Sequence, residues 1–573
     1  MRNSGTSWRI LSSDDAIVNQ LAGALNLNKT ASRLLVQRGI SSVEEVRKFL
    51  DPRLDHLHNP LRLTDLGLAM DRLMRAIHVG ESIVVHGDYD VDGITSTVIL
   101  QRVLELLGGN VSHYIPNRLT DGYGLRPETI DRFADQGHRV IVTVDCGIRS
   151  LDAAKRAKKR AVDLIITDHH EPGDLLPDAF AVINPRRYDC DYPEKNLSGV
   201  GVAFKLVQAL CSRSGRDEWI GSFIKIAAIG TVADIVPLVG ENRTIAKIGL
   251  DKLSQGRNSA GLNALLESSG LEGRRITSQE VSFSLAPRLN AAGRMSTPEL
   301  AVQLLMQRGE KGNHEARRLA SEIEQKNSLR RETEAAIVSE ARIRIEKSPQ
   351  LILDPLLVVW DDKWHRGVIG IVAAKLVEMF GRPAIVFSID GELSYGSCRS
   401  VPGLDILDNL EKCSELCVQL GGHRYAAGLT VETCRLEELR TCLNRNLKAA
   451  QGSSLQPQEL IIDGSLRLSQ INEGLMDDLR RMEPFGSGNR RPVFLAEAVK
   501  ICDGPRQIGE QHLRMTFRQE GCRVRGVAWR VGEERQVYQQ NGSLIDIVFS
   551  LAENHFRSET FIELSIEGAK KHG

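Results

Sequence analysis

The sequence of 573 residues lacks three features that would each assign it to a class. It has no net charge, since 74 Lys and Arg residues balance 74 Asp and Glu residues, which excludes a protein that coats nucleic acid by overall charge alone. It has no apolar run near the roughly 20 residues that a membrane span requires. Its start, MRNSGTSWRILSSDD, has no apolar core of a signal peptide. We therefore expect a cytoplasmic protein with no membrane partner.

Cysteine is also sparse, with ten residues and no CxxC pair to indicate a zinc site. Cys413 and Cys417 lie four apart in a segment that is predicted to be helical, where they would share a face. We interpret them as packing residues and not as half of a metal site. Reduced thiols are expected, as in most cytoplasmic proteins.

Alternating patterns predict an α/β architecture. Apolar residues make up 42% of the chain, which is enough for packed cores, and the length suggests about four domains. The serines at 41–42, followed by Glu44 and Glu45, have the spacing of a capping box and predict a helix through Leu50. Between about 60 and 240, helices alternate with β-branched runs, which indicates a parallel sheet buried on both faces. These runs are 82–85, 140–144, 164–167 and 181–183.

The rest of the chain divides into further parts. A charged segment without Pro or Gly, 313–347, is predicted to be a long helix that connects two lobes. A second α/β region follows and opens with the strand 355–360; the polar segment 451–458 is a linker, and the pattern beyond it is mostly β. The predicted fold class is therefore α/β multidomain, with a C-terminal β domain. We place the domains at 1–58, 59–304, 305–350, 351–452 and 453–573.

Three carboxylates, Asp88, Asp90 and Asp92, follow the first of these strands in HGDYDVDGITS (86–96). In an extended chain, side chains two apart share a face, so the three can converge, and a divalent cation would relieve their repulsion. The pattern also begins like an EF-hand, but Ile99 stands where the twelfth-position glutamate should be, and a strand precedes the motif in place of a helix. A calcium loop is thus excluded, and a solvated acidic loop is the alternative on this motif alone.

Further acids and histidines follow other predicted elements. Asp145 ends one strand, Asp168, His169 and His170 end another, and Asp234 follows an apolar helical run in GTVADIVPL. Ligands of open α/β sheets bind beyond the carboxyl ends of the strands. Carboxylates together with imidazole suit manganese, and two metal ions about 4 Å apart recur in enzymes that hydrolyse phosphoesters. The four motifs together therefore predict a two-metal hydrolytic site.

The motifs HGDYDVDGITS, VTVDCG, TDHH and GTVADIVPL resemble, in this order, those of the DHH phosphoesterase superfamily. Other stretches resemble its branch of single-strand-specific 5′→3′ exonucleases: IPNRLTDGYGL (115–125), LSGVGVAFKL (197–206), APRLNAAGRM (286–295), WHRGVIGIVAAKL (364–376) and GGHRYAAG (421–428). The resemblance runs from about residue 8 to the end and is firmest between 80 and 430. It implies a DHH catalytic domain, a DHH-associated domain over 351–452 and a C-terminal OB-fold.

The resemblance also implies metal-site roles. The ligands of two divalent cations, with Mn²⁺ as the first choice and Mg²⁺ as the second, would be Asp90, Asp92, Asp145, His169 and Asp234. Asp145 would bridge the two ions and count as catalytic, as would Asp88 and His170, which would orient ligands or water from outside the metal shell. The place of His86 as a ligand stays open.

A substrate-binding set is implied in the same way. Arg118, Ser397 and Arg399 would form a pocket for a 5′-phosphate, because an arginine fork matches phosphate geometry. Arg288 and Arg294 would hold phosphates near the scissile bond, and His423 would contact the scissile phosphate. The segment 485–536 has ten basic and six acidic residues with aromatic residues between them, a composition that suits contact with a single strand.

The activity implied is metal-dependent 5′→3′ degradation of single-stranded DNA to 5′-mononucleotides, in DNA recombination and repair. The family picture adds a narrow channel that excludes duplex, cooperation with a single-strand-binding protein and a RecQ-type helicase, and a monomer as the default. One alternative is a small-substrate phosphatase or short-oligonucleotide hydrolase, which the C-terminal β region argues against. The other is a binding protein without catalysis, like helicase-associated relatives, which the full set of predicted ligands argues against.

Overall fold

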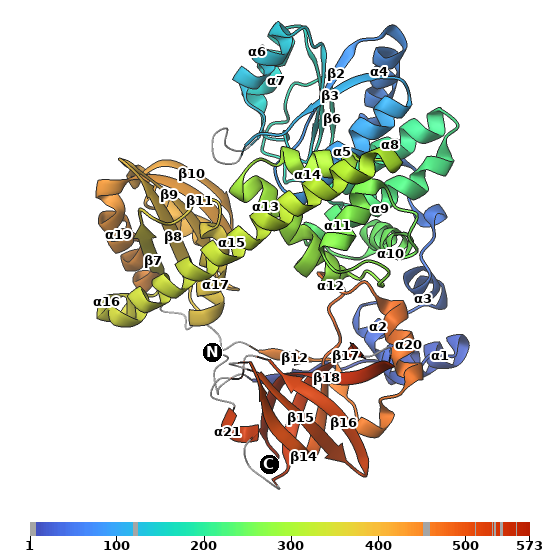
Figure 1. Ribbon diagram of the computed structural model, residues 1–573, viewed down its shortest axis with the longest axis vertical. Helices are drawn as coiled ribbons and strands as arrows, with labels where there is room; N and C mark the ends of the chain where they lie inside the picture. The colour runs from blue at the N-terminus through green and yellow to red at the C-terminus, as the bar shows by residue number, and fades with distance from the viewer. Residues whose placement is uncertain are drawn as a thin grey trace.

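The computed structural model describes residues 7–117, 124–450, 459–509, 512–529, 531, 535–538, 543–556 and 559–573. Figure 1 shows three bodies at the corners of a triangle, with a long helix running from one corner to the next. The chain enters the first body at about residue 60, crosses to the second along the long helix, and ends in a third body made mainly of strands. None of the helices in the described part of the chain is long and apolar enough to cross a membrane.

The first body contains a five-stranded sheet, in which every pair of neighbouring strands is parallel and the order is β3-β2-β4-β5-β6. The strands are β2 (Ser82–His86), β3 (Asn110–Tyr114), β4 (Val140–Val144), β5 (Asp163–Thr167) and β6 (Ala181–Ile183). The four predicted strands are confirmed. The additional strand β3 has the polar sequence NVSHY and lies at the edge, where its side chains are only partly buried.

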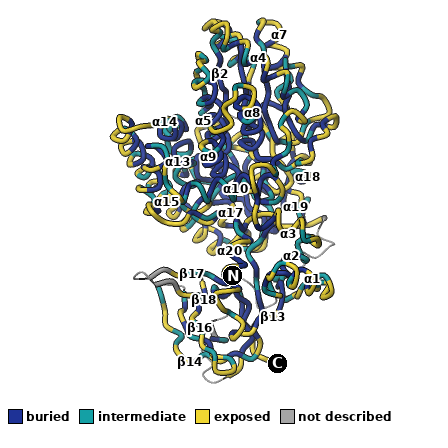
Figure 2. Tube along the Cα trace, turned by 90° about the vertical axis from the view of Figure 1, so that its right-hand side faces the viewer, coloured by how far each residue is buried: buried dark blue, intermediate teal, exposed yellow. Residues whose placement is uncertain are grey.

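Alternate residues of these strands enter two different cores, which confirms burial on both faces. Val85 and Val142 face one core, whereas Val84 and Ile141 face the other. Helices of the first core include α4 (Leu66–Val79), α5 (Val91–Leu106), α8 (Gly199–Arg213) and α9 (Ile220–Ala233), and those of the second are α6 (Pro127–Asp135) and α7 (Leu151–Lys159). Figure 2 shows the trace through β2, α5, α8 and α9 as mostly buried.

Further helices extend the first body: α10 (Gly240–Ser254), α11 (Ala260–Ser268), α12 (Ser278–Glu280), α13 (Ala286–Met295) and α14 (Glu299–Met306). The long helix α15 (Asn313–Lys347) has the predicted bounds. Leu319 and Ile323 in its first half pack into the core of the first body, whereas Ile337 and Ile345 pack into the second. The prediction that this helix connects two lobes is confirmed.

The second body has a mixed five-stranded sheet in the order β10-β11-β9-β8-β7. Helix α17 packs with the end of α15 on one face, and α18 and α19 pack on the other. The elements are α16 (Pro349–Leu353), β7 (Leu357–Asp361), α17 (Ile369–Phe380), β8 (Ala384–Asp390), β9 (Leu393–Arg399), α18 (Ile406–Glu411), β10 (Cys417–His423), β11 (Ala426–Glu432) and α19 (Leu436–Ala450).

The structure corrects the interpretation of two cysteines in this body. Cys413 lies in the turn after α18, and Cys417 is the first residue of strand β10, so the segment between them is not one helix. Cys413 is joined to Cys442 of α19 by a disulfide, so the prediction of reduced thiols is wrong for this pair. The pairing crosses 29 positions of sequence, which is why spacing alone gave no sign of it.

The third body is a closed barrel, because β14 pairs with both β15 and β17. Its strands are β14 (Phe494–Ile508), β15 (His512–Gln519), β16 (Cys522–Ala528), β17 (Ile545–Phe556) and β18 (Glu559–Lys571), with β12 (Leu460–Ile462), β13 (Gly464–Ser465), α20 (Glu473–Met482) and α21 (Arg535–Tyr538) beside them. The predicted fold class, α/β multidomain with a C-terminal β domain, is thus confirmed.

The two ends of the chain form one body. Strand β1 (Trp8–Ile10) pairs in parallel with β12, and helices α1 (Asp15–Leu25), α2 (Lys29–Gln37) and α3 (Val43–Leu50) share a core with the barrel. Helix α3 begins at a capping box of Ser42 and Glu45 and ends at Leu50, as predicted. Figure 1 shows α1 and α2 beside α20, far from the strands that follow them in sequence.

Arg243 of α10 joins the first body to this third one. Its guanidinium donates to the carbonyl oxygens of Phe49, Met482 and Glu483 at 2.7, 2.9 and 3.0 Å, and lies 3.6 Å from the centre of the Phe49 ring. The side chain is buried, so these acceptors replace water around the cation. Arg243 therefore holds the barrel and the N-terminal helices to the first body.

Candidate metal centre

In the first acidic motif, the chain turns sharply between the end of β2 and the start of α5. Asp88 lies in the loop, and Asp90 is the N-cap of α5, where its Oδ1 accepts from the backbone N–H groups of Asp92 and Gly93 at 3.0 and 3.2 Å. Asp92 is already in the first turn of the helix, so the predicted extended chain is wrong. The carboxylates converge through the helix cap, because the cap folds the backbone back on itself. A Cβ at Gly93 would lie 2.5 Å from the Asp88 carbonyl oxygen, so glycine is required for this corner.

The N-terminus of α8 holds Asp92 in place. The backbone N–H groups of Gly199 and Val200 donate to its two carboxylate oxygens, each at 2.7 Å. Free N–H groups at a helix N-terminus favour negative charge. The stretch LSGVG supplies this anchor, a role that sequence reasoning missed because only the resemblance to the family singled the stretch out.

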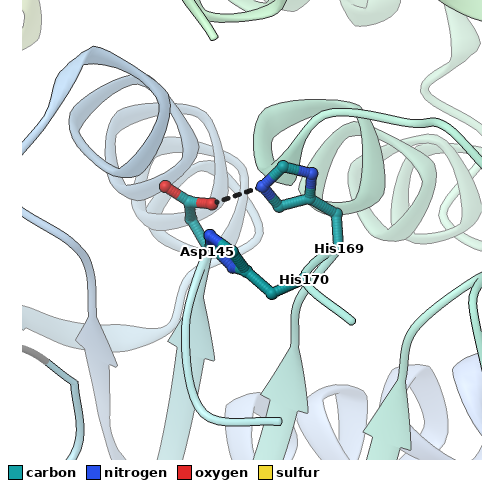
Figure 3. A group of neighbouring side chains, drawn as sticks. All are labelled: Asp145, His169 and His170. Carbon is teal, nitrogen blue, oxygen red and sulfur yellow. Dashed lines mark ion pairs between the residues drawn. The ribbon is translucent and has the colours of Figure 1, made fainter. Parts of the chain in front are cut away.

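Asp145 and the histidines follow β4 and β5 at the same edge of the sheet. The Oδ1 atom of Asp145 lies 3.2 Å from Nε2 of His169, as Figure 3 shows. The Nδ1 atom of His169 is 3.1 Å from the Leu197 carbonyl oxygen, a contact that turns Nε2 toward the acids. Asp168 binds the second histidine, since its Oδ1 lies 2.7 Å from Nδ1 of His170.

Asp234 completes the cluster from the C-terminal end of α9. Its Oδ2 lies 3.7 Å from His169 Nε2, and Asp92 Oδ2 lies 3.9 Å from the same nitrogen. His169 therefore stands between carboxylates from three separate elements. The structure thus brings all five predicted metal ligands together.

The side chains form three groups, and within each group the potential ligand atoms lie within 4.8 Å of one another. The groups are Asp88, Asp90 and Asp145; Asp92, His169 and Asp234; and Asp145, His169 and His170. Asp88 and His170, which we expected outside the metal shell, thus belong to the same cluster. His86 belongs to none of these groups in the described chain, and its Nδ1 instead lies 3.7 Å from Cys146 Sγ.

Burial and mutual repulsion shape the titration of this cluster. Burial, followed by the charge of Asp90, raises the pKa of Asp92 to about 7. Burial and the charge of Asp92 raise the pKa of Asp234 to about 10. The same causes raise the pKa of Asp145 well above its usual range, and burial lowers the pKa of His169 to about 4.

These groups fit divalent cations. Within the described part of the chain, Oδ1 of Asp145 and Oδ2 of Asp234 are buried and have no hydrogen-bond donor, so each has a lone pair available to a cation. A neutral imidazole is the form that binds a metal, and cationic charge would offset the repulsion that raises the acids' pKa values. Oxygen and imidazole donors suit Mn²⁺ and Mg²⁺ better than softer ions.

The predicted phosphate-binding pair lies in the second body. Ser397 and Arg399 are on one face of β9, and Arg399 Nη1 lies 3.3 Å from Ser397 Oγ. The first turn of α17 covers them, because a Cβ at Gly370 would lie 2.9 Å from Ser397 Oγ and 3.4 Å from Arg399 Nη2. Among the residues that the structure describes, no side chain forms a cap hydrogen bond at the N-terminus of α17. A hydroxyl, a guanidinium and a helix N-terminus thus meet at one point, which suits an anion.

Of the other predicted substrate residues, His423 is the last residue of β10 in the second body and is exposed. Burial, followed by the positive charges of Arg149 and His170, lowers its pKa, so both groups lie near it. Arg294 Nη1 is 3.3 Å from the carbonyl oxygen of Gly367 in the second body. Arg288 forms an ion pair with Glu324 of α15. Arg118 lies outside the described residues.

Family models and sequence relatives match the three bodies of this chain. The model for the DHH family N-terminal domain matches residues 82–231, that for the DHHA1 domain matches 353–449, and that for the RecJ OB domain matches 462–568. The single-stranded-DNA-specific exonuclease RecJ of Bacillus subtilis (strain 168) is 37% identical over 571 residues, which are 98% of this chain and 70% of that protein. Its namesake in Escherichia coli (strain K12) is 33% identical and covers 93% of this chain, with 94% of that protein matched. The chain belongs to the RecJ family.

Solved RecJ structures support the same assignment. The crystal structure of RecJ in complex with Mn²⁺ from Thermus thermophilus matches with a TM-score of 0.84 at 29% identity, covering 99% of this chain and 80% of that one. The Mg²⁺ complex of that protein matches with a TM-score of 0.78 at 28% identity. The predicted resemblance and the OB-fold of the C-terminal domain are thereby confirmed.

Proposed function

We propose that this chain is a single-stranded-DNA-specific exonuclease that degrades DNA 5′→3′ to 5′-mononucleotides by two-metal-ion hydrolysis, in recombination and repair. The observation that carries the proposal is that two clusters of potential metal ligands meet at Asp145. Asp145 shares the first cluster with Asp88 and Asp90. It contacts the second through His169, which is grouped with Asp92 and Asp234. Near relatives bear the name single-stranded-DNA-specific exonuclease RecJ, and a related structure holds Mn²⁺.

The cofactors we propose are two Mn²⁺ ions, with Mg²⁺ as the second choice, held by Asp90, Asp92, Asp145, His169 and Asp234. Bound ions of this kind lower the pKa of water and stabilise charge on the phosphate. Asp145 belongs to one group with Asp88 and Asp90 and to another with His169, which supports a role in contacting both ions. The backbone N–H groups at the start of α8 would hold the Asp92 carboxylate in the cluster. The hydrogen bond between Asp168 and His170 keeps a proton on Nδ1 of His170 and so leaves its Nε2 to accept one.

Residues of the second body would hold the substrate. Ser397 and Arg399, with Arg118, would bind the terminal 5′-phosphate under the N-terminus of α17. His423 would contact the scissile phosphate. We also propose that Arg288 exchanges its Glu324 partner for a DNA phosphate, and that Arg294, whose Nη1 lies near the Gly367 carbonyl oxygen, holds a phosphate near the scissile bond.

We propose a cytoplasmic monomer that acts on strands opened by a RecQ-type helicase and covered by a single-strand-binding protein. The domain division 1–58, 59–304, 305–350, 351–452 and 453–573 stays our proposal for the functional units. Because residues of 1–58 and 453–573 share one hydrophobic core, we propose that these two segments form one functional unit.

Single-stranded and duplex DNA, labelled at either the 5′ or the 3′ end, with Mn²⁺, Mg²⁺ or EDTA, test the proposal. We expect metal-dependent release of mononucleotides from 5′ ends of single strands only. A 3′-labelled strand should shorten stepwise, whereas a 5′ label should leave in the first turnover. Hydrolysis confined to dinucleotides would favour an oligonucleotide hydrolase, and DNA binding without hydrolysis under every metal would favour a binding protein.

A further inference from the structure

Four of the ten cysteines lie between residues 413 and 442, in the second body. Cys413 is fully buried at the turn after α18, and its sulfur is bonded to that of Cys442 on α19. The amide nitrogen Nδ2 of Asn446 lies 3.3 Å from the Cys413 sulfur and 3.9 Å from the Cys442 sulfur. One amide group thus contacts both sulfurs and can stabilise negative charge on either.

The pair is reached from solvent on one side. Cys442 lines a surface cavity of about 460 Å³, whose charged residues are Arg435, Arg445, Glu415, Glu437 and Glu438. Cys413 lies behind Cys442 and has no exposed surface. A small oxidant would therefore meet Cys442 first, with Cys413 in place as the second thiol.

The bridge fastens an edge of the sheet that carries the proposed substrate residues. It ties the turn before β10 to α19, and β10 is the edge strand, which among the described strands pairs only with β11. Five of the seven residues of β10 are exposed, and the strand ends at His423. Strand β11 pairs in turn with β9, which bears Ser397 and Arg399. An edge strand with one partner gains most from a tether at its end.

We propose that Cys413 and Cys442 form a peroxide-sensitive dithiol–disulfide pair whose oxidised state holds β10, and with it His423, in position. The Cys442 thiol first loses its proton to solvent, and the thiolate attacks a peroxide oxygen. The O–O bond breaks, so that a sulfenic acid and a hydroxide ion form, and the hydroxide takes up the released proton to become water. The Cys413 thiol then attacks the sulfenic sulfur, the S–S bond forms, and a second water leaves with the proton of the thiol. The two thiols together lose two electrons to the peroxide, and a reducing dithiol restores them by exchange.

The first test maps the bond in the full chain. The protein is treated with hydrogen peroxide, alkylated without reductant and digested for mass spectrometry. We expect one linked peptide pair, Cys413 with Cys442, two hydrogens lighter than the separate peptides and lost after dithiothreitol. The variant Cys442→Ser should abolish it, whereas Cys434→Ser, an exposed cysteine of the same body, should keep it. Recovery of Cys413 and Cys442 as alkylated thiols after peroxide would overturn the proposal.

The second test measures the consequence. We expect the oxidised protein to resist proteolysis between 413 and 442 by about tenfold or more relative to the reduced protein, since a bridge removes open states of the segment. The kcat/KM for single-stranded DNA should fall several-fold on reduction and become insensitive to redox state in Cys442→Ser. Equal protease resistance and equal kcat/KM in both states would refute the tether. The mapping and proteolysis do not depend on nuclease activity, so they stand or fall separately from the proposed function.

Discussion

Replacing Asp145 by Asn tests whether the acidic cluster is built around cations. Asp145 has a φ of 61°, a left-handed conformation that Asn tolerates, so the backbone is preserved. Its ligand atoms lie within 4.8 Å of those of Asp88 and Asp90. At an effective dielectric of about 20, two ionised carboxylates at that separation repel by about 3 kcal/mol. The pKa of Asp145 lies well above its usual range, so protonation relieves part of this repulsion and leaves about 2 kcal/mol.

Without metal, Asp145→Asn should therefore be more stable than the parent protein. A net gain of about 2 kcal/mol corresponds to a rise of roughly 4–8 °C in Tm for a body of this size. With Mn²⁺ the order should reverse, because the variant lacks the carboxylate shared by two donor groups, and turnover should fall about a thousandfold or more.

Differential scanning calorimetry in EDTA and in MnCl₂, beside a labelled-DNA assay, measures these effects. Asp152→Asn is the matched control, since Asp152 is an exposed acid on α7 of the same body. The reasoning is refuted if the EDTA-treated variant melts below the parent protein and its Mn²⁺-induced rise in Tm is intact.

Three further predictions use other parts of the structure. Arg399→Ala should slow hydrolysis of 5′-phosphorylated strands about 10- to 100-fold, because a charge-assisted hydrogen bond is lost, and leave 5′-hydroxyl strands unchanged; equal slowing of both would contradict the pocket. Because burial and Asp90 raise the pKa of Asp92 to about 7, folding takes up a proton there, so the free energy of unfolding in EDTA should fall as the pH rises from about 4 to about 7. Thermal melts across that range test this, and a flat profile in EDTA would speak against it. Arg243→Met should lower the free energy of unfolding by about 3 kcal/mol, since buried carbonyl groups lose their donor, and limited proteolysis should then release the barrel; an unchanged digest would argue against that joint.

Local patterns were enough for most of the elements. The β-branched runs predicted strands β2, β4, β5 and β6, because a strand buried on both faces has few polar residues. Charge density without Pro or Gly predicted α15. Strand β3 was missed because NVSHY is polar and lies at an edge, where pairing and not burial holds it.

Errors arose where backbone geometry depends on a cap or a distant partner. The spacing of Asp88, Asp90 and Asp92 suggested an extended chain, but Asp90 caps α5 and turns the chain into a helix. The cysteines at 413 and 417 looked helical, yet Cys413 pairs with a residue of α19. The first outcome depends on a cap within four residues, whereas the second depends on a partner 29 positions away.

The sequence by itself determined which residues could serve a metal site, because their acid and imidazole types, and their places after strands, are local properties. Only the tertiary structure decided how they meet. The Leu197 carbonyl oxygen orients the His169 ring, and the N-terminus of α8 binds the Asp92 carboxylate. Asp234 lies at the C-terminal end of α9. Only it decided, too, that α1–α3 join the barrel, since that contact crosses more than 400 positions. Periodicity reports which face of an element is apolar, whereas the choice of partner for that face depends on the whole chain.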